Sequence, residues 1–198
     1  MNQLDIILIV IILAGIVVGW RRGLIRMLIS IASIYIIVIV AGYAYKAIGD
    51  TLVGGLGHLG IHLGTVGAHN FSYIVVVVGL TVAFELAARN SFEATQIRSL
   101  GVFDNVLGVL AGIIYGMLWA SLFLVPLQYS AAREASPWVS AISGSTLVPT
   151  LNRVFQSAVL DIVSIFFING VPALYRNSVS IRVFGLLRLL ASSWHLSV

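Results

Sequence analysis

Three of the four histidines in this sequence lie in one glycine-rich stretch, and their spacing is compatible with a metal site. His58 and His62 are four residues apart and His69 follows. Two histidines at this spacing share one face of a helix and can bind a metal ion together. However, the intervening glycines weaken any helix here, and Asp50 is the only carboxylate near them in the sequence. We therefore predict no metal and no cofactor, and the role of the three histidines stays open.

The sequence also contains few candidate residues for nucleophilic or acid–base catalysis. Ser143 and Ser145 flank Gly144, but they lack the pattern of a nucleophile elbow and a nearby base, and the chain has no cysteine. Glu85 is the one acid well inside an apolar run, four residues before Arg89. This spacing favours an ion pair on one helix face, and the alternative role is a proton or ion relay within the membrane. We predict no catalytic residues and a protein that is not an enzyme.

The composition predicts a membrane protein. Of the 198 residues, 60% are hydrophobic and only 9% are charged, whereas about a quarter of a soluble domain is charged. The positive charge comes from ten scattered arginines and one lysine, which suits lipid headgroups better than nucleic acid. The first ten residues have no basic region and no cleavage site follows them, so we expect no removable signal peptide.

Apolar runs predict an all-α membrane domain over residues 1–127 with four transmembrane helices. The runs cover about residues 4–20, 24–45, 71–88 and 106–127, and Pro126 closes the last one. The first two are so close that they must form an antiparallel hairpin. The glycine-rich stretch 49–70 and the polar stretch 89–105 are predicted loops.

The tail, residues 128–198, is predicted to hold an amphipathic helix over 151–168 and a basic terminal segment. Apolar residues share one face of that helix and polar residues the other, which is typical of a helix that lies in the membrane interface. Asp161 would be costly at the centre of a bilayer. The alternative is a fifth span over 151–171.

Arginines near the span ends predict the orientation. The first and third loops carry Arg21, Arg22, Arg26, Arg89 and Arg98, which favours the cytoplasm for both loops. Both termini are then periplasmic. The five arginines of the tail instead favour the alternative with a fifth span, which would return the last three of them to the cytoplasm.

Two stripes of glycine at four-residue spacing predict close helix packing. Gly15, Gly19 and Gly23 mark the first span, and Gly108, Gly112 and Gly116 mark the fourth. Small residues at this spacing let membrane helices approach closely. We expect the two spans to pack within one chain as a glycine zipper. The alternatives are a homo-oligomer and the binding of a foreign helix.

A charged residue stands at the head of the second stripe. Asp104 lies one turn before Gly108, while Arg22 and Arg26 lie beside Gly23, on the same side of the membrane. We predict an ion pair between Asp104 and one of these arginines. The simpler alternative is that Asp104 caps its own helix.

These residues resemble the two sequence signatures of the colicin V production protein (CvpA) family. Arg22, Gly23 and Arg26 match the first signature, with Asp5 near the start of the chain. The second signature is matched by Leu100, Gly101, Asp104, Leu107, Gly108, Gly112 and Gly116. Asn105, Met27 and Tyr115 depart from the charged residues that the family usually has. The resemblance covers about residues 1–130 and leaves the rest of the tail unassigned.

The resemblance implies a multi-pass protein of the bacterial inner membrane, associated with colicin V production and export and with envelope maintenance. Two functions fit the sequence. One is a non-enzymatic scaffold or accessory factor, whose partners are the lipid bilayer and other envelope proteins. The other is a small oligomeric channel or transporter with a path near Glu85. The near absence of polar residues from the first, second and fourth spans favours the scaffold.

Overall fold

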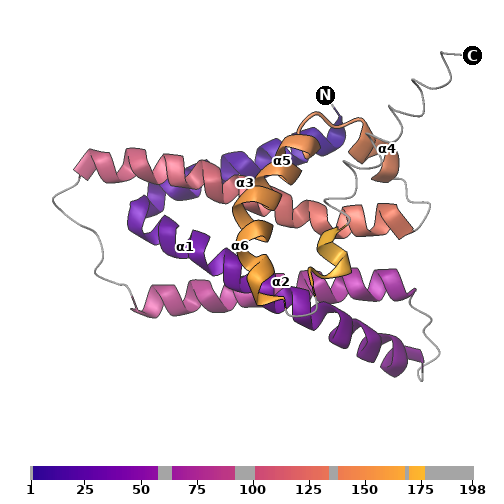
Figure 1. Cartoon of the computed structure of the whole chain (residues 1–198). Helices are drawn as coiled ribbons and strands as arrows, with labels where there is room; N and C mark the ends of the chain where they lie inside the picture. Colours follow the sequence, from indigo (N-terminus) through magenta and orange to yellow (C-terminus); the bar gives the residue numbers. More distant parts are fainter. Residues whose placement is uncertain (1, 58–63, 92–100, 134–137, 168–169, 177–198) are drawn as a thin grey trace, which may run out of the picture.

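Three long helices form a bundle in the computed structural model, which describes residues 2–57, 64–91, 101–133, 138–167 and 170–176. They are α1 (Gln3–Gly57), α2 (Thr65–Ser91) and α3 (Gly101–Arg133) (Figure 1). Within the described ranges, these are the three helices that are long and apolar enough to cross a membrane. The chain is thus an all-helical protein of the membrane type in its described part, as the composition predicts.

Helix α1 changes direction at Gly23, without a loop. Gly23 has φ +75° and ψ 174°, which is not helical and which residues with a Cβ rarely adopt. Before this kink, Gly15 lies against Gly116; after it, the rings of Tyr45 and Tyr129 are 6.4 Å apart. The first segment of α1 (residues 3–22) therefore runs antiparallel to α3 and the second segment (residues 24–57) runs parallel to it. The predicted hairpin exists, and one glycine makes its turn.

The two glycine stripes face each other in this bundle. A Cβ on Gly112 would lie 2.5 Å from the carbonyl oxygen of Gly15, and one on Gly108 would lie 2.5 Å from that of Gly19. A Cβ on Gly116 would lie 2.8 Å from the Cα of Ile12. Real side chains are never this close to a backbone, so only glycine permits this approach. The first segment of α1 and α3 are consequently in backbone contact along several turns.

The helices extend further than the sequence predicts. Residues 49–57 and 65–70 were expected in a loop but belong to α1 and α2. The cause is packing, because Gly49 lies against the ring and backbone of His69 and lets the two helix ends close together. Pro126 does not end the fourth span but lies inside α3, which continues to Arg133; membrane helices tolerate such prolines. Of the predicted loop 89–105, residues 92–100 are outside the described residues.

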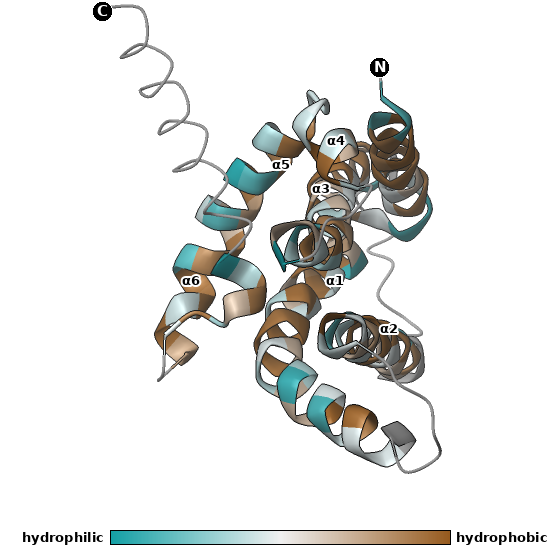
Figure 2. Ribbon diagram, turned by 90° about the vertical axis from the view of Figure 1, so that its right-hand side faces the viewer, coloured by the Kyte–Doolittle hydropathy of each residue, from teal (hydrophilic) through white to brown (hydrophobic). Residues whose placement is uncertain are grey.

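The tail folds into short helical pieces on one face of the bundle. They are α4 (Trp138–Ser143), α5 (Val148–Phe155), the π turn η1 (Gln156–Leu160), α6 (Asp161–Val163) and the 3₁₀ turn η2 (Ser164–Phe166). Figure 2 shows α5 and α6 on the opposite side of the bundle from α2. The predicted basic terminal segment after residue 176 is outside the described residues.

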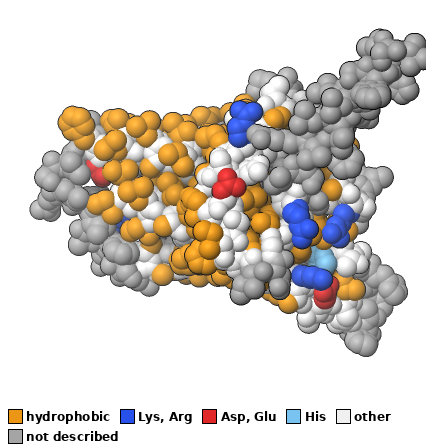
Figure 3. Space-filling view, viewed as in Figure 1, with side chains coloured by type: hydrophobic (Ala, Val, Ile, Leu, Met, Phe, Trp, Pro, Cys, Tyr) orange, Lys and Arg blue, Asp and Glu red, His pale blue; other side chains and the backbone are white. Residues whose placement is uncertain are grey.

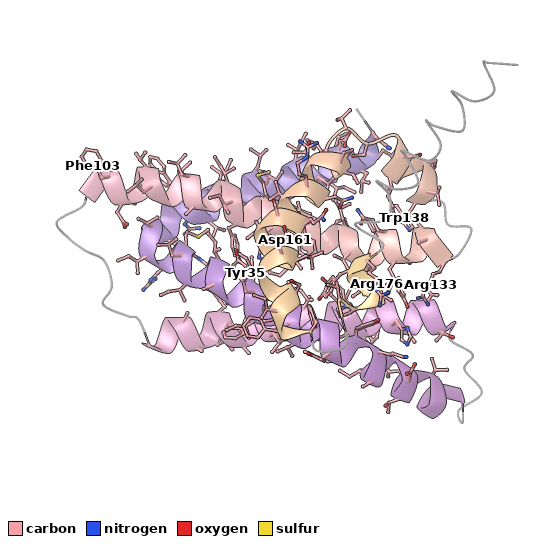
Figure 4. The ribbon with its side chains drawn as sticks, viewed as in Figure 1. Tyr35, Phe103, Arg133, Trp138, Asp161 and Arg176 are labelled. Carbon is pink, nitrogen blue, oxygen red and sulfur yellow. The ribbon has the colours of Figure 1, made fainter. Side chains whose placement is uncertain are left out.

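The helical pieces from Val148 to Phe166 cover the predicted amphipathic stretch, and they pack against the bundle. Phe155, Val159 and Val163 are buried among side chains of α1 and α3. The hydroxyl group of Tyr35 donates a hydrogen bond to the carbonyl oxygen of Ala158 at 2.9 Å. Asp161 lies on the outward side, over the middle of the bundle (Figure 4). The first half of the predicted apolar stripe therefore faces other helices, whereas Ile162, Ile165 and Phe166 in its second half are exposed.

Candidate functional site

A cavity of about 570 Å³ lies between the first segment of α1, α2 and α3. Ala14 and Val18 form one wall, Ile74 and Val78 the other, and Trp119 belongs to the floor. Nearly all of its surface is apolar, and exposed hydrophobic side chains such as Val78 border it. The tail is on the opposite face of the bundle (Figure 2). We call this cavity the lateral groove.

An ion pair lies beyond one end of the lateral groove. Arg22 is one turn beyond Val18 on α1, and Glu85 is two turns beyond Val78 on α2. The Nη1 atom of Arg22 donates to Oε2 of Glu85 at 2.8 Å. This contact joins the two walls, so the groove cannot continue past it. Glu85, for which the sequence left a relay role open, thus has a structural partner on another helix.

The opposite end of the groove is polar. The side-chain amide of Asn70 on α2 donates a hydrogen bond to the hydroxyl oxygen of Ser130 on α3 at 2.5 Å. The buried Oδ1 atom of Asn70 has no hydrogen-bond partner among the described residues. Buried polar atoms are normally paired. The polar end of the groove therefore contains one buried acceptor without a partner among the described residues.

A second set of hydrogen bonds runs parallel to this pair, one residue earlier on both helices. His69 is buried, its Nε2 atom lies 2.8 Å from Oδ1 of Asp50, and its Nδ1 atom lies 3.2 Å from the hydroxyl oxygen of Tyr129. The guanidinium group of Arg133 lies 4.5 Å from the centre of the Tyr129 ring. This chain ties the ends of α1, α2 and α3 together, and it gives His69 a structural role.

Metal binding gains no support from the described residues. They contain no group of three His, Cys, Asp or Glu side chains that could hold an ion. His58 and His62, whose spacing is compatible with a metal site, are outside the described ranges.

Asp104 acts on the backbone of α1. Its Oδ1 atom accepts a hydrogen bond from the backbone amide of Leu24 at 3.0 Å, directly after the Gly23 kink. A Cβ on Gly23 would collide with the Asp104 carboxylate. The carboxylate therefore caps the beginning of the second segment of α1, where a helix N-terminus favours negative charge. This cap differs from both predictions, because the ion pair of Arg22 is with Glu85 and the capped helix is not Asp104's own.

Asp5 joins the beginning of the chain to the tail. Its side chain is only 1% exposed, and its carboxylate accepts hydrogen bonds from the Ser145 hydroxyl and from the backbone amide of Leu147 at 3.4 Å. Thr146 donates through its hydroxyl group at 3.4 Å and through its backbone amide at 3.5 Å. These residues directly precede α5. The carboxylate thus fixes the start of the tail helix against α1.

The sequence does not point to three residues of this site, because Asn70, Tyr129 and Ser130 lie in a predicted loop or outside the predicted spans. Asp50 stands out in the sequence only as the carboxylate near the histidines. The one pattern in the sequence that indicates a site here is the presence of polar residues near both ends of the 49–70 stretch. Their position beside α3 depends on α1 extending to Gly57 and α2 beginning at Thr65, which the sequence does not predict.

Comparisons with known proteins agree with the signatures on α1 and α3. The family model described as colicin V production protein matches residues 4–156, so it includes the bundle and α5. No curated protein and no solved structure gives a match. Because the matched range covers most of the chain, the protein belongs to the colicin V production protein family.

Proposed function

We propose that this protein is a non-enzymatic scaffold or accessory factor of the bacterial inner membrane, acting in colicin V production and export and in envelope maintenance. The family membership supports the setting. Its partners would be the lipid bilayer and other inner-membrane or envelope proteins. A homo-oligomer is compatible with this role.

The main support for this proposal is that charged side chains in the bundle make structural contacts. Asp5 holds the tail, Asp104 caps the second segment of α1, and Arg22 pairs with Glu85. Each of these groups has a structural contact, whereas a conduit normally needs ionisable groups that line a water-filled path. The lateral groove is apolar and opens sideways. The bundle is therefore suited to holding a shape and less suited to passing ions.

The proposed topology has four crossings. Residues 3–22 are about 30 Å long at 1.5 Å per residue, which is the thickness of the hydrocarbon core. The kink at Gly23 then returns the chain, so that α1 crosses twice and α2 and α3 once each. The Gly23 turn is on the cytoplasmic side and both termini are periplasmic, while the tail helix packs against the side of the bundle.

Ion flux and complementation together test the scaffold against the channel. The double variant Arg22→Gln, Glu85→Gln removes both charges and leaves neither partner uncompensated. We expect proteoliposomes with the wild-type protein to conduct no more ions than empty liposomes. We expect the double variant to restore colicin V secretion in cells that lack this chain. A wild-type ion flux that the double variant abolishes would favour the channel and would overturn the scaffold.

A further inference from the structure

We propose that the lateral groove is a binding site for one phospholipid, with an acyl chain in the groove and the ester region of the lipid beside Asn70 and Ser130. This inference does not depend on the scaffold role, because a lipid could occupy the groove of a scaffold or of a channel.

The closed end of the groove favours a lipid over a helix. A transmembrane helix from a partner or from a second copy is about 10–12 Å wide and must continue through the whole bilayer. The Arg22–Glu85 ion pair, at 2.8 Å, joins α1 and α2 on the line that such a helix would follow. An acyl chain enters from one leaflet and ends within the membrane. A groove that ends blindly fits the chain and excludes the helix.

The dimensions of the groove agree with this occupant. From Ser130 at the polar end to Tyr115 at the far end, α3 rises about 22 Å at 1.5 Å per residue. Half of the hydrocarbon core is about 15 Å thick, so an extended chain from one leaflet fits within that length. The volume of about 570 Å³ lies in the range of about 300–1,000 Å³ that is usual for small-molecule sites. The walls are apolar, as an acyl chain requires.

The polar end supplies what the rest of a phospholipid requires. Ser130 accepts its hydrogen bond from Asn70, so its own hydroxyl proton can be donated to an ester carbonyl or a phosphate oxygen. Asn70 and Ser130 both line the groove where it begins, and the apolar lining follows. This sequence of polar and apolar surface matches the order of groups along a phospholipid.

Photocrosslinking in liposomes tests the site. The probe is a phosphatidylethanolamine with a diazirine in the middle of one acyl chain. We expect the label to be found mainly on the α3 peptide that includes residues 115–130. The variant Ala14→Phe, Val78→Phe fills the groove from both walls, because both residues are exposed members of its lining. We expect it to reduce this label about tenfold, which corresponds to 1.4 kcal/mol of binding free energy.

The matched control is Leu13→Phe, Val75→Phe, which adds the same side chains at exposed positions of the same two helices outside the groove. We expect wild-type labelling from it. Equal labelling of all three proteins would show ordinary lipid contact and overturn the proposal. Native mass spectrometry of the detergent-solubilised wild type gives a check without substitutions: one retained phospholipid is expected, and the bare protein alone would contradict the site.

Discussion

The substitution Gly112→Leu is expected to abolish the folded bundle. A Cβ at this position would lie 2.5 Å from the carbonyl oxygen of Gly15 and 3.1 Å from the Cα of Gly19. Because both neighbours are backbone atoms, no side chain can move aside, and the helices must separate. Overpacking in a core costs about 1–3 kcal/mol or more, and separation would remove the contacts of the whole stripe. Thermal unfolding in detergent and size-exclusion chromatography measure the effect.

Two further variants make this expectation specific. Gly112→Ala adds only the Cβ, and we expect it to be milder than leucine but still destabilising, since that atom already collides with backbone. Gly79→Leu is the matched control on α2, where nothing lies within 4 Å of the added Cβ. This control should unfold at or above the wild-type temperature, because leucine is the better helix former by roughly 1 kcal/mol. Equal stability of Gly112→Leu and Gly79→Leu would contradict close packing.

The substitution Asp5→Ala is expected to release the tail from the bundle. It removes the acceptor of the hydrogen bonds from Ser145, Thr146 and Leu147. A buried donor that loses its partner costs about 1–3 kcal/mol, and several donors lose theirs at once. Cleavage by added protease within residues 138–167 should therefore become much faster than in the wild type. The rate of that cleavage, followed by mass spectrometry, is the measurement.

Asp161→Ala is the control for this experiment. Asp161 is an exposed acid on the same tail (Figure 4), so its removal changes the charge but not the anchor. We expect its cleavage rate to equal that of the wild type. If Asp5→Ala were as resistant to protease as Asp161→Ala, the tail would be held by its apolar contacts alone.

The sequence predicts the packing of the membrane domain better than its edges. Glycine at four-residue spacing has one common use in membrane helices, so Gly15, Gly19, Gly108 and Gly112 could be placed against each other before the structure was known. The ends of α1 and α2 were not predicted. Single-residue propensity made the stretch 49–70 a loop, whereas the contact of Gly49 with His69 keeps both helices intact there.

Partners of charged residues were harder to predict than their positions. Asp104 and Arg22 are both near the Gly23 turn, and a pair between them was reasonable from topology. In the structure, Arg22 instead forms an ion pair with Glu85. Asp104 accepts a hydrogen bond from the backbone amide of Leu24, because the kink leaves this amide without an acceptor within its own helix. The positive φ of Gly23 creates this need, and no sequence pattern reveals it. The lateral groove was missed for a similar reason, since it depends on how far apart α1 and α2 lie.

Figure 3 shows hydrophobic side chains over much of one face of the bundle and Lys, Arg and His side chains gathered toward one end. Phe103 and Arg133 lie at opposite ends of α3 (Figure 4). This distribution agrees with a bundle whose helices run across the membrane. The central feature of the proposed topology is that α1 crosses the membrane twice.

Cysteine labelling tests this double crossing most directly, because the chain has no cysteine. Gln3, Arg21 and Thr51 are exposed on α1, before, beside and well after the Gly23 kink. Single variants Gln3→Cys, Arg21→Cys and Thr51→Cys are treated with a membrane-impermeant maleimide in spheroplasts. We predict that Gln3→Cys and Thr51→Cys are labelled from outside and that Arg21→Cys is labelled only after the membrane is opened. Labelling of Gln3→Cys and Thr51→Cys from opposite sides would mean that α1 crosses once, and it would contradict the four-crossing bundle.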